Sequence, residues 1–146
     1  MKTIKIIKSI VKSHRGGFKP VFLRLDPTWT PEDLEYMKAA LETELIVYWC
    51  IAEENLHTNK DAAQWLSEWL STTVYARMSG NKAIFVVGLT EFPETEQTAF
   101  FRELNSGSSQ LQNINLPVFF IVNAATLAIA HDAAPSFCGG VTTHRL

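Results

Sequence analysis

The sequence of 146 residues is poor in cysteine, in excess basic charge and in long apolar runs. Its two cysteines, Cys50 and Cys138, lie far apart in apolar contexts, which is typical of free buried thiols in a reducing cytoplasm and not of a disulfide framework. The net charge of −2 lacks the basic excess of nucleic-acid-binding proteins, so we expect no nucleic-acid partner. No apolar run approaches the roughly 20 residues of a membrane span, so we expect no such span.

The turn after the first apolar run also lacks glycine. Residues 26–33 read Asp-Pro-Thr-Trp-Thr-Pro-Glu-Asp, with two prolines, one tryptophan and three acids. In an α/β nucleotide-binding protein this turn is rich in glycine, so that backbone N–H groups can hold phosphates. Proline has no N–H and acids repel a phosphate. We therefore predict that residues 26–31 bind no phosphate, that the protein uses no cofactor and that it does not hydrolyse ATP.

The rest of the composition is that of a folded domain. Hydrophobic residues make up 47% and charged residues 19%, which excludes a disordered chain. The length is sufficient for one hydrophobic core. We predict a single α/β domain over 1–146, with an N-terminal amphipathic helix in 1–15 and the α/β core in 19–138.

Four apolar runs alternate with helical patterns in this core. They are residues 19–25, 45–52, 83–89 and 117–122. Such alternation predicts three layers, with a mainly parallel sheet of about four to five strands between helices. Residues 135–146 show no regular pattern, and we expect them to be irregular.

Polar residues follow each predicted strand. They are Asp26, then Glu53 and Glu54, then Thr90 and Glu91, then Asn123. In parallel sheets ligands bind outside the carboxyl ends of the strands, so acids there could hold a divalent metal or act as a general base. This favours an alternative function, a small metal-dependent hydrolase that uses Asp26, Glu54 and Glu91. The simpler interpretation is that these side chains cap the next helix, and our main prediction therefore assigns no catalytic residue.

The histidines and cysteines indicate no metal site. No histidines form a close pair, and neither cysteine has a partner at zinc spacing. A cysteine-protease interpretation would use Cys138, before Gly139-Gly140, with His57 or His131 as the base. It requires that one of these bases lies within reach of the thiol.

Two features favour contact with a protein. Trp29 lies in the polar turn after the first strand, where we expect it to be exposed, whereas Trp49 lies in an apolar run and is expected in the core. Lys5, Lys8 and Lys12 alternate with apolar residues in the N-terminal helix, which either docks on the domain or binds a partner. We predict that Trp29 and these three lysines bind a protein partner or a second copy of the chain. Lys8 and Lys12 also interrupt any signal-peptide core.

The second half of the chain resembles a known family. Residues 85–91, Phe-Val-Val-Gly-Leu-Thr-Glu, and the helix that ends in Phe-Arg-Glu-Leu-Asn at 101–105 resemble the Walker B region of bacterial AAA/STAND-like P-loop NTPase domains. Such domains are often attached to tetratricopeptide repeats. Residues 116–122 are similar to the sensor strand of the family, and residues 128–137 to the helix and proline-containing stretch that follow it.

The resemblance implies a P-loop-NTPase-like fold, with a Rossmann-like fold as the alternative. It implies a parallel sheet of order 2-3-4-1, with the first strand beside the fourth, whereas a flavodoxin-like sheet would have the order 2-1-3-4. The chain departs from the family because it has no Gly-Lys-Ser/Thr loop, and because only Glu91 could replace the acid that ends the third strand.

The resemblance and its departures together imply a degenerate core that has lost catalysis. We predict a non-catalytic module that acts through protein–protein interaction or assembly, in regulation or in a bacterial conflict or defence system. We place it in the cytoplasm.

Overall fold

The computed structural model describes residues 2–14, 17–51, 82–106 and 116–145. The helix that the pattern predicts near 58–79 lies outside these residues. The elements are α1 (Lys2–Ser13), β1 (Lys19–Arg24), α2 (Pro31–Glu42), β2 (Ile46–Ile51), β3 (Lys82–Val87), the 3-10 helix η2 (Leu89–Glu91), α5 (Glu94–Ser106), β4 (Pro117–Val122), α7 (Ala124–Ala133), α8 (Pro135–Cys138) and β5 (Thr142–Arg145).

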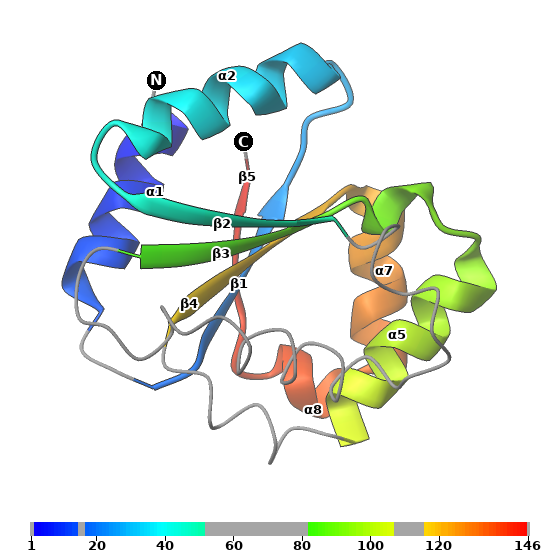
Figure 1. Cartoon of the computed structure of the whole chain (residues 1–146). Helices are drawn as coiled ribbons and strands as arrows, with labels where there is room; N and C mark the ends of the chain where they lie inside the picture. The colour runs from blue at the N-terminus through cyan, green and yellow to red at the C-terminus, as the bar shows by residue number, and fades with distance from the viewer. Residues whose placement is uncertain (1, 15–16, 52–81, 107–115, 146) are drawn as a thin grey trace.

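The five strands form one parallel sheet in the order β2-β3-β4-β1-β5 (Figure 1). Strand β1 lies beside β4, which confirms the order that the resemblance implied and excludes the flavodoxin-like order. Every residue of β3 and β4 is buried, as expected for central strands covered on both faces.

The C-terminal tail is not irregular, and that expectation is wrong. Residues 135–138 form α8, and residues 142–145 form β5 at the edge of the sheet, paired with Val21–Arg24 of β1. The sequence of β5 is Thr-Thr-His-Arg, and its side chains are mostly exposed. A short polar edge strand has no apolar pattern, so nothing in its composition marked it as a strand.

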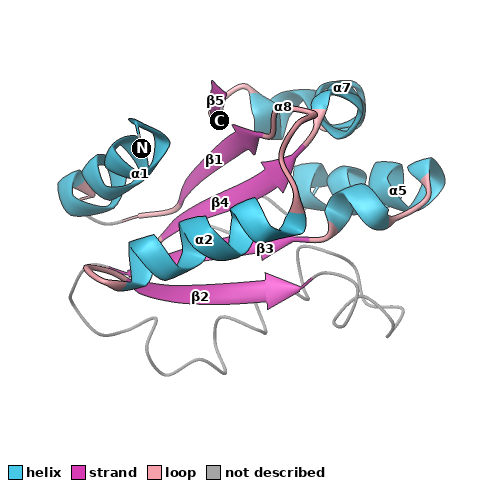
Figure 2. Ribbon diagram, turned by 90° about the horizontal axis from the view of Figure 1, so that it is seen from above, coloured by secondary structure: helices cyan, strands magenta, loops and turns pink. Residues whose placement is uncertain are grey.

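The sheet separates two apolar cores, because successive residues of a strand point to opposite faces. Phe22 and Phe120 lie in the core beneath α5, α7 and α8, whereas Leu23 and Phe119 lie in the core beneath α1 and α2. Figures 1 and 2 show these two groups of helices on opposite sides of the sheet. The predicted three-layer α/β fold is therefore confirmed.

Helix α1 docks on the domain. Its residues Ile4, Ile7 and Val11 are buried in the same core as α2. Lys8 forms an ion pair with Glu44, just after α2, and Lys12 Nζ lies 3.3 Å from Oε1 of the same carboxylate. Among the helices that the structure describes, none is long and apolar enough to cross a membrane.

Candidate functional site

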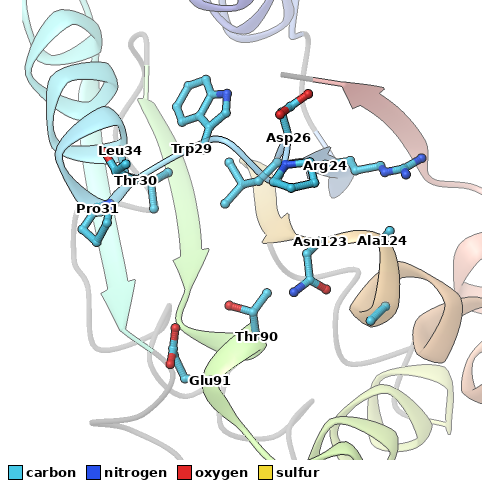
Figure 3. Close-up of a pocket in the computed structure, with 13 residues that line it drawn as sticks. Arg24, Asp26, Trp29, Thr30, Pro31, Leu34, Thr90, Glu91, Asn123 and Ala124 are labelled. Carbon is cyan, nitrogen blue, oxygen red and sulfur yellow. The ribbon is translucent and has the colours of Figure 1, made fainter.

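A pocket of about 520 Å³ opens at the carboxyl edge of the sheet (Figure 3). It lies where β1, β4 and β3 end side by side. The residues that line it are Arg24, Leu25, Asp26, Pro27, Trp29, Thr30, Pro31, Leu34, Thr90, Glu91, Asn123, Ala124 and Ala125. Because the strands are parallel, their carboxyl ends meet at one edge, and the three following loops converge there.

The strand-end prediction is therefore right in its geometry for the described strands. Asp26, Glu91 and Asn123 all line this one pocket, although they lie far apart in the sequence. Glu53 and Glu54 lie outside the described residues. Asn123 acts as a helix cap, because its Oδ1 accepts a hydrogen bond from the N–H of Thr126 at 2.8 Å.

The loop between β1 and α2 uses its backbone donors within the protein. The N–H of Thr28 donates to Oδ1 of Asp26 at 2.9 Å, and the N–H of Trp29 donates to the carbonyl oxygen of Asp26 at 3.0 Å. The N–H of Thr30 donates to Oδ2 of Asp33 at 2.7 Å. Pro27 and Pro31 have no N–H. From residue 27 to residue 31, no backbone donor is left for a ligand.

The carboxylate of Asp26 holds this loop in place. Besides the N–H of Thr28, it accepts the hydroxyl of Thr28 at 2.7 Å. These two hydrogen bonds, with a smaller contribution from the positive charge of Arg24, lower the pKa of Asp26 below its usual 3.8. The Asp26 carboxylate thus accepts hydrogen bonds from donors that a bound phosphate would need.

Helix α2 begins at a capping box, which the sequence Thr30-Pro31-Glu32-Asp33 predicts. Thr30 is the N-cap, its hydroxyl accepts the N–H of Asp33 at 3.3 Å, and the Asp33 carboxylate accepts the N–H of Thr30. Glu32 and Asp33 place negative charge in the first turn. This charge stabilises the helix and repels a second anion from its N-terminus.

Strand β3 ends without an acid. It ends at Val87, two residues earlier than predicted, because Gly88 adopts a left-handed conformation with φ of 88°. The 3-10 helix η2 follows, with Leu89 buried and Glu91 exposed. Glu91 therefore lies one turn beyond the strand, where it lines the pocket but does not continue β3.

The acids of the pocket do not converge. Figure 3 shows the carboxylates of Asp26 and Glu91 on opposite sides, with that of Asp26 directed away from Glu91. The described part of the chain holds no group of three His, Cys, Asp or Glu side chains placed to bind a metal ion. Glu54, the third acid of the hydrolase alternative, lies outside this part, so that alternative stays a prediction from the sequence.

The residues predicted to bind a partner lie in two places. Trp29 lines the pocket and is half-buried against the core beneath α1 and α2, so it is less exposed than we expected. Lys8 and Lys12 pair with Glu44, beyond the other end of α2, a helix about 18 Å long from its 12 residues. Lys5 is exposed on α1. Lys8 and Lys12 therefore lie away from Trp29.

Cys138 is a buried thiol. Its Sγ donates to the carbonyl oxygen of Ala130 at 3.4 Å, and burial raises the pKa of the thiol above 9.0. A raised pKa disfavours the thiolate that a cysteine nucleophile needs. His131 is exposed, and its ring faces Phe22. His57 lies outside the described residues, so this part of the chain gives the cysteine-protease interpretation no support.

Arg24 and Leu34 are among the pocket residues that were not singled out from the sequence. Arg24 is the last residue of β1, and Leu34 lies in the first turns of α2. The position of Arg24 at the carboxyl end of a predicted strand was the signal that could have identified it. Leu34 carried no such signal, since its apolar character was already explained by packing.

No model of a known protein family matches the chain, and no curated protein matches its sequence. Solved structures do match its fold. The ORC2 protein of Aeropyrum pernix in its ADP form has a TM-score of 0.56 at 11% identity, and it aligns with 99% of this chain and 46% of its own. Drosophila ORC bound to poly(dA/dT) DNA and Cdc6 has a TM-score of 0.55 at 12% identity, over 99% of this chain and 28% of its own.

These likenesses show a P-loop NTPase-like fold. This chain spans less than half the length of both structures. A P-loop NTPase binds its nucleotide at the loop after β1, through a Gly-Lys-Ser/Thr motif and Mg²⁺. The loop of this chain does not fit that ligand, because its donors are used by Asp26 and Asp33 and its other two positions are prolines. The fold therefore places this pocket where P-loop proteins bind a nucleotide, but its loop lacks the donors that bind the phosphates.

Proposed function

We propose that this chain is a non-catalytic P-loop NTPase-like module that acts through contact with another protein. One observation carries the proposal: every position from Pro27 to Pro31 either lacks an N–H or donates it within the protein. A fold that places a pocket at the nucleotide position, without donors for phosphate, is suited to a ligand other than a nucleotide.

The lining of the pocket supports a protein ligand. Trp29, Pro31 and Leu34 contribute apolar side chains to its lining, and Thr90 and Asn123 contribute polar ones. A rigid half-buried indole beside an apolar hollow is the kind of group that dominates protein interfaces. In this proposal, Trp29 is the anchor that meets the partner, and the ion-paired Lys8 and Lys12 hold α1 in place.

Calorimetric titration with ATP, with and without Mg²⁺, tests the non-catalytic part of the proposal. We expect no affinity tighter than about 1 mM, which corresponds to about 4 kcal/mol of binding free energy. We also expect no phosphate release, because the loop has no free N–H donor for a phosphate. Micromolar binding of ATP would overturn it.

The partner role is tested with Trp29→Ala. Tyr36→Ala is the matched control, because Tyr36 is an exposed aromatic residue of α2 that does not line the pocket. Self-association, measured by sedimentation of the purified chain, and partner binding, measured by pull-down, should weaken with Trp29→Ala and not with Tyr36→Ala. Equal behaviour of the two variants would remove Trp29 from the contact.

The finer assignment rests on the sequence resemblance alone. In this proposal the chain is a degenerate relative of bacterial AAA/STAND-like domains, with a regulatory role or a role in conflict or defence. Identification of co-purifying proteins from the source cell is the measurement that tests it.

A further inference from the structure

Two arginines lie side by side at the carboxyl edge of the sheet. Arg24 is the last residue of β1, Arg145 is the last residue of β5, and the two are register partners in the parallel pairing of these strands. Neighbouring strands lie about 4.8 Å apart, and register partners present their side chains on the same face. The fold therefore places the side chains of two arginines on the same face of neighbouring strands.

Both arginines line one small hollow. It has a volume of about 80 Å³ and is bounded by Arg24, Leu25, Asp26, Pro27 and Arg145. Its first four residues also line the larger pocket, so the two hollows adjoin. The small hollow has room for more than one water molecule. This space is sufficient for a single oxoanion group.

The charges in this hollow do not balance. Two guanidiniums and the carboxylate of Asp26 leave one net positive charge, since an arginine stays protonated at all physiological pH values. Like charges opposite each other on neighbouring strands are unfavourable. Within the described part of the chain, neither Arg24 nor Arg145 forms an ion pair with a carboxylate.

Asp26 can neutralise only one of the two guanidinium charges. Its carboxylate accepts the N–H and the hydroxyl of Thr28, which direct it into its own loop. Figure 3 shows the Arg24 side chain and the Asp26 carboxylate extending in different directions from the end of β1. Within the described residues, the side chains of Arg24 and Arg145 donate no hydrogen bond to a protein acceptor, so their donors are available to an external one.

The geometry points to a carboxylate-binding site formed by Arg24 and Arg145, which receives an acidic side chain of the partner protein. Guanidinium groups bind carboxylates through paired hydrogen bonds. The single net charge favours a carboxylate, with one negative charge, over a phosphate group, which carries −1.5 to −2 and would lie beside Asp26. The inference rests on the proposed function, because it names the chemistry of the partner at the same edge of the sheet.

A nuclear magnetic resonance titration of the full chain tests this site. The probe is the peptide acetyl-Gly-Glu-Gly-amide, and acetyl-Gly-Gln-Gly-amide is its uncharged match. We expect the glutamate peptide to shift the Nε–Hε resonances of Arg24 and Arg145, and the glutamine peptide to leave them in place. Equal shifts with both peptides, or no shift with the glutamate peptide, would overturn the proposal.

Variants separate the site from general charge effects. Arg145→Gln should weaken the binding of the glutamate peptide by about tenfold or more, because charge-assisted hydrogen bonds are lost. Arg102→Gln removes the same charge from an exposed position of α5 and should change nothing. Arg145→Lys keeps the charge without the guanidinium and should also weaken binding. Wild-type affinity in both Arg145 variants would overturn the proposal.

Two further titrations complete the test. Inorganic phosphate that binds more tightly than the glutamate peptide would replace the acidic partner by a phosphate ligand and would overturn the inference. ATP calorimetry addresses the proposed function separately, since tight ATP binding contradicts that function whatever the peptides do. Circular dichroism melts of each variant show whether it is folded, and the wild-type resonances give a result that depends on no variant.

Discussion

The carboxylate of Asp26 accepts two hydrogen bonds from Thr28, one from its N–H at 2.9 Å and one from its hydroxyl at 2.7 Å. The second residue after β1 is therefore an internal anion, in the loop where P-loop proteins bind an external one. The loop that connects β1 to α2 is held by these internal hydrogen bonds, and they leave no donor for a phosphate. This single arrangement links the stability of the pocket to the lack of nucleotide chemistry that we propose.

Asp26→Asn should reduce stability in a pH-dependent way. The hydrogen bonds from Thr28 lower the pKa of Asp26 in the folded state, so its contribution is present above the unfolded pKa near 3.8 and is lost as the pH falls through the lowered value. The urea midpoints of wild type and variant should therefore differ most at neutral pH and converge as the pH falls below the lowered pKa of Asp26. A difference that does not change with pH would show that the carboxylate charge has no role in the loop.

Ile7→Ala and Glu44→Gln separate the two ways in which α1 is held. Ile7 is fully buried, and its truncation should cost about 2–4 kcal/mol of unfolding free energy. Glu44 pairs with Lys8 and Lys12 at the surface, so Glu44→Gln should leave the urea midpoint nearly unchanged, with any effect smaller at high salt. A larger loss with Glu44→Gln than with Ile7→Ala would mean that charge, and not the apolar stripe, docks the helix.

The order of the sheet was implied by the family resemblance, whereas the apolar runs predicted only that strands such as β3 lie in its interior. Residues 83–87 of β3 and all of β4 are apolar, which is typical of strands covered on both faces. Strand β5 could not be predicted, since four polar residues at an edge carry no such pattern and form a strand only because β1 offers an open edge.

The site was predictable in position and not in detail. Parallel strands bring Asp26 and Asn123 to one edge wherever the fold is right. The half-burial of Trp29 depends on how its ring packs against the core beneath α1 and α2, and the pairing of Arg24 with Arg145 depends on the unpredicted β5. These are tertiary contacts between residues far apart in the chain, so local sequence patterns do not predict them.

Asn123→Ala should destabilise the protein by about 1 kcal/mol, the usual effect of losing an N-cap. Its Oδ1 accepts the N–H of Thr126, a buried residue in the first turn of α7. Asn123→Ser keeps a capping oxygen and should stay close to wild type in urea denaturation. If both variants lose the same free energy, the side chain of Asn123 stabilises the pocket by packing and not by capping.

Trp49→Ala and Trp29→Ala should differ in their cost, although both side chains are half-buried. Trp49 was expected in the core, and its partial exposure lowers the cost that a fully buried tryptophan would have. Its ring stacks on Phe85 with centroids 5.6 Å apart, and Phe85 stacks on Phe119 at 4.8 Å. Nζ of Lys38 lies 5.3 Å from the centroid of the Trp49 ring.

These contacts join three neighbouring strands, so we expect Trp49→Ala to cost about 2–3 kcal/mol, somewhat less than the truncation of a fully buried aromatic residue. Trp29 lies in a loop, at the edge of its core and the wall of the pocket, and Trp29→Ala should cost only about 1 kcal/mol. Urea denaturation followed by circular dichroism measures both, with Trp49→Phe as the control that keeps an aromatic ring on Phe85. If Trp29→Ala costs as much as Trp49→Ala, then Trp29 is held by the core, and its role as the anchor for a partner loses its support.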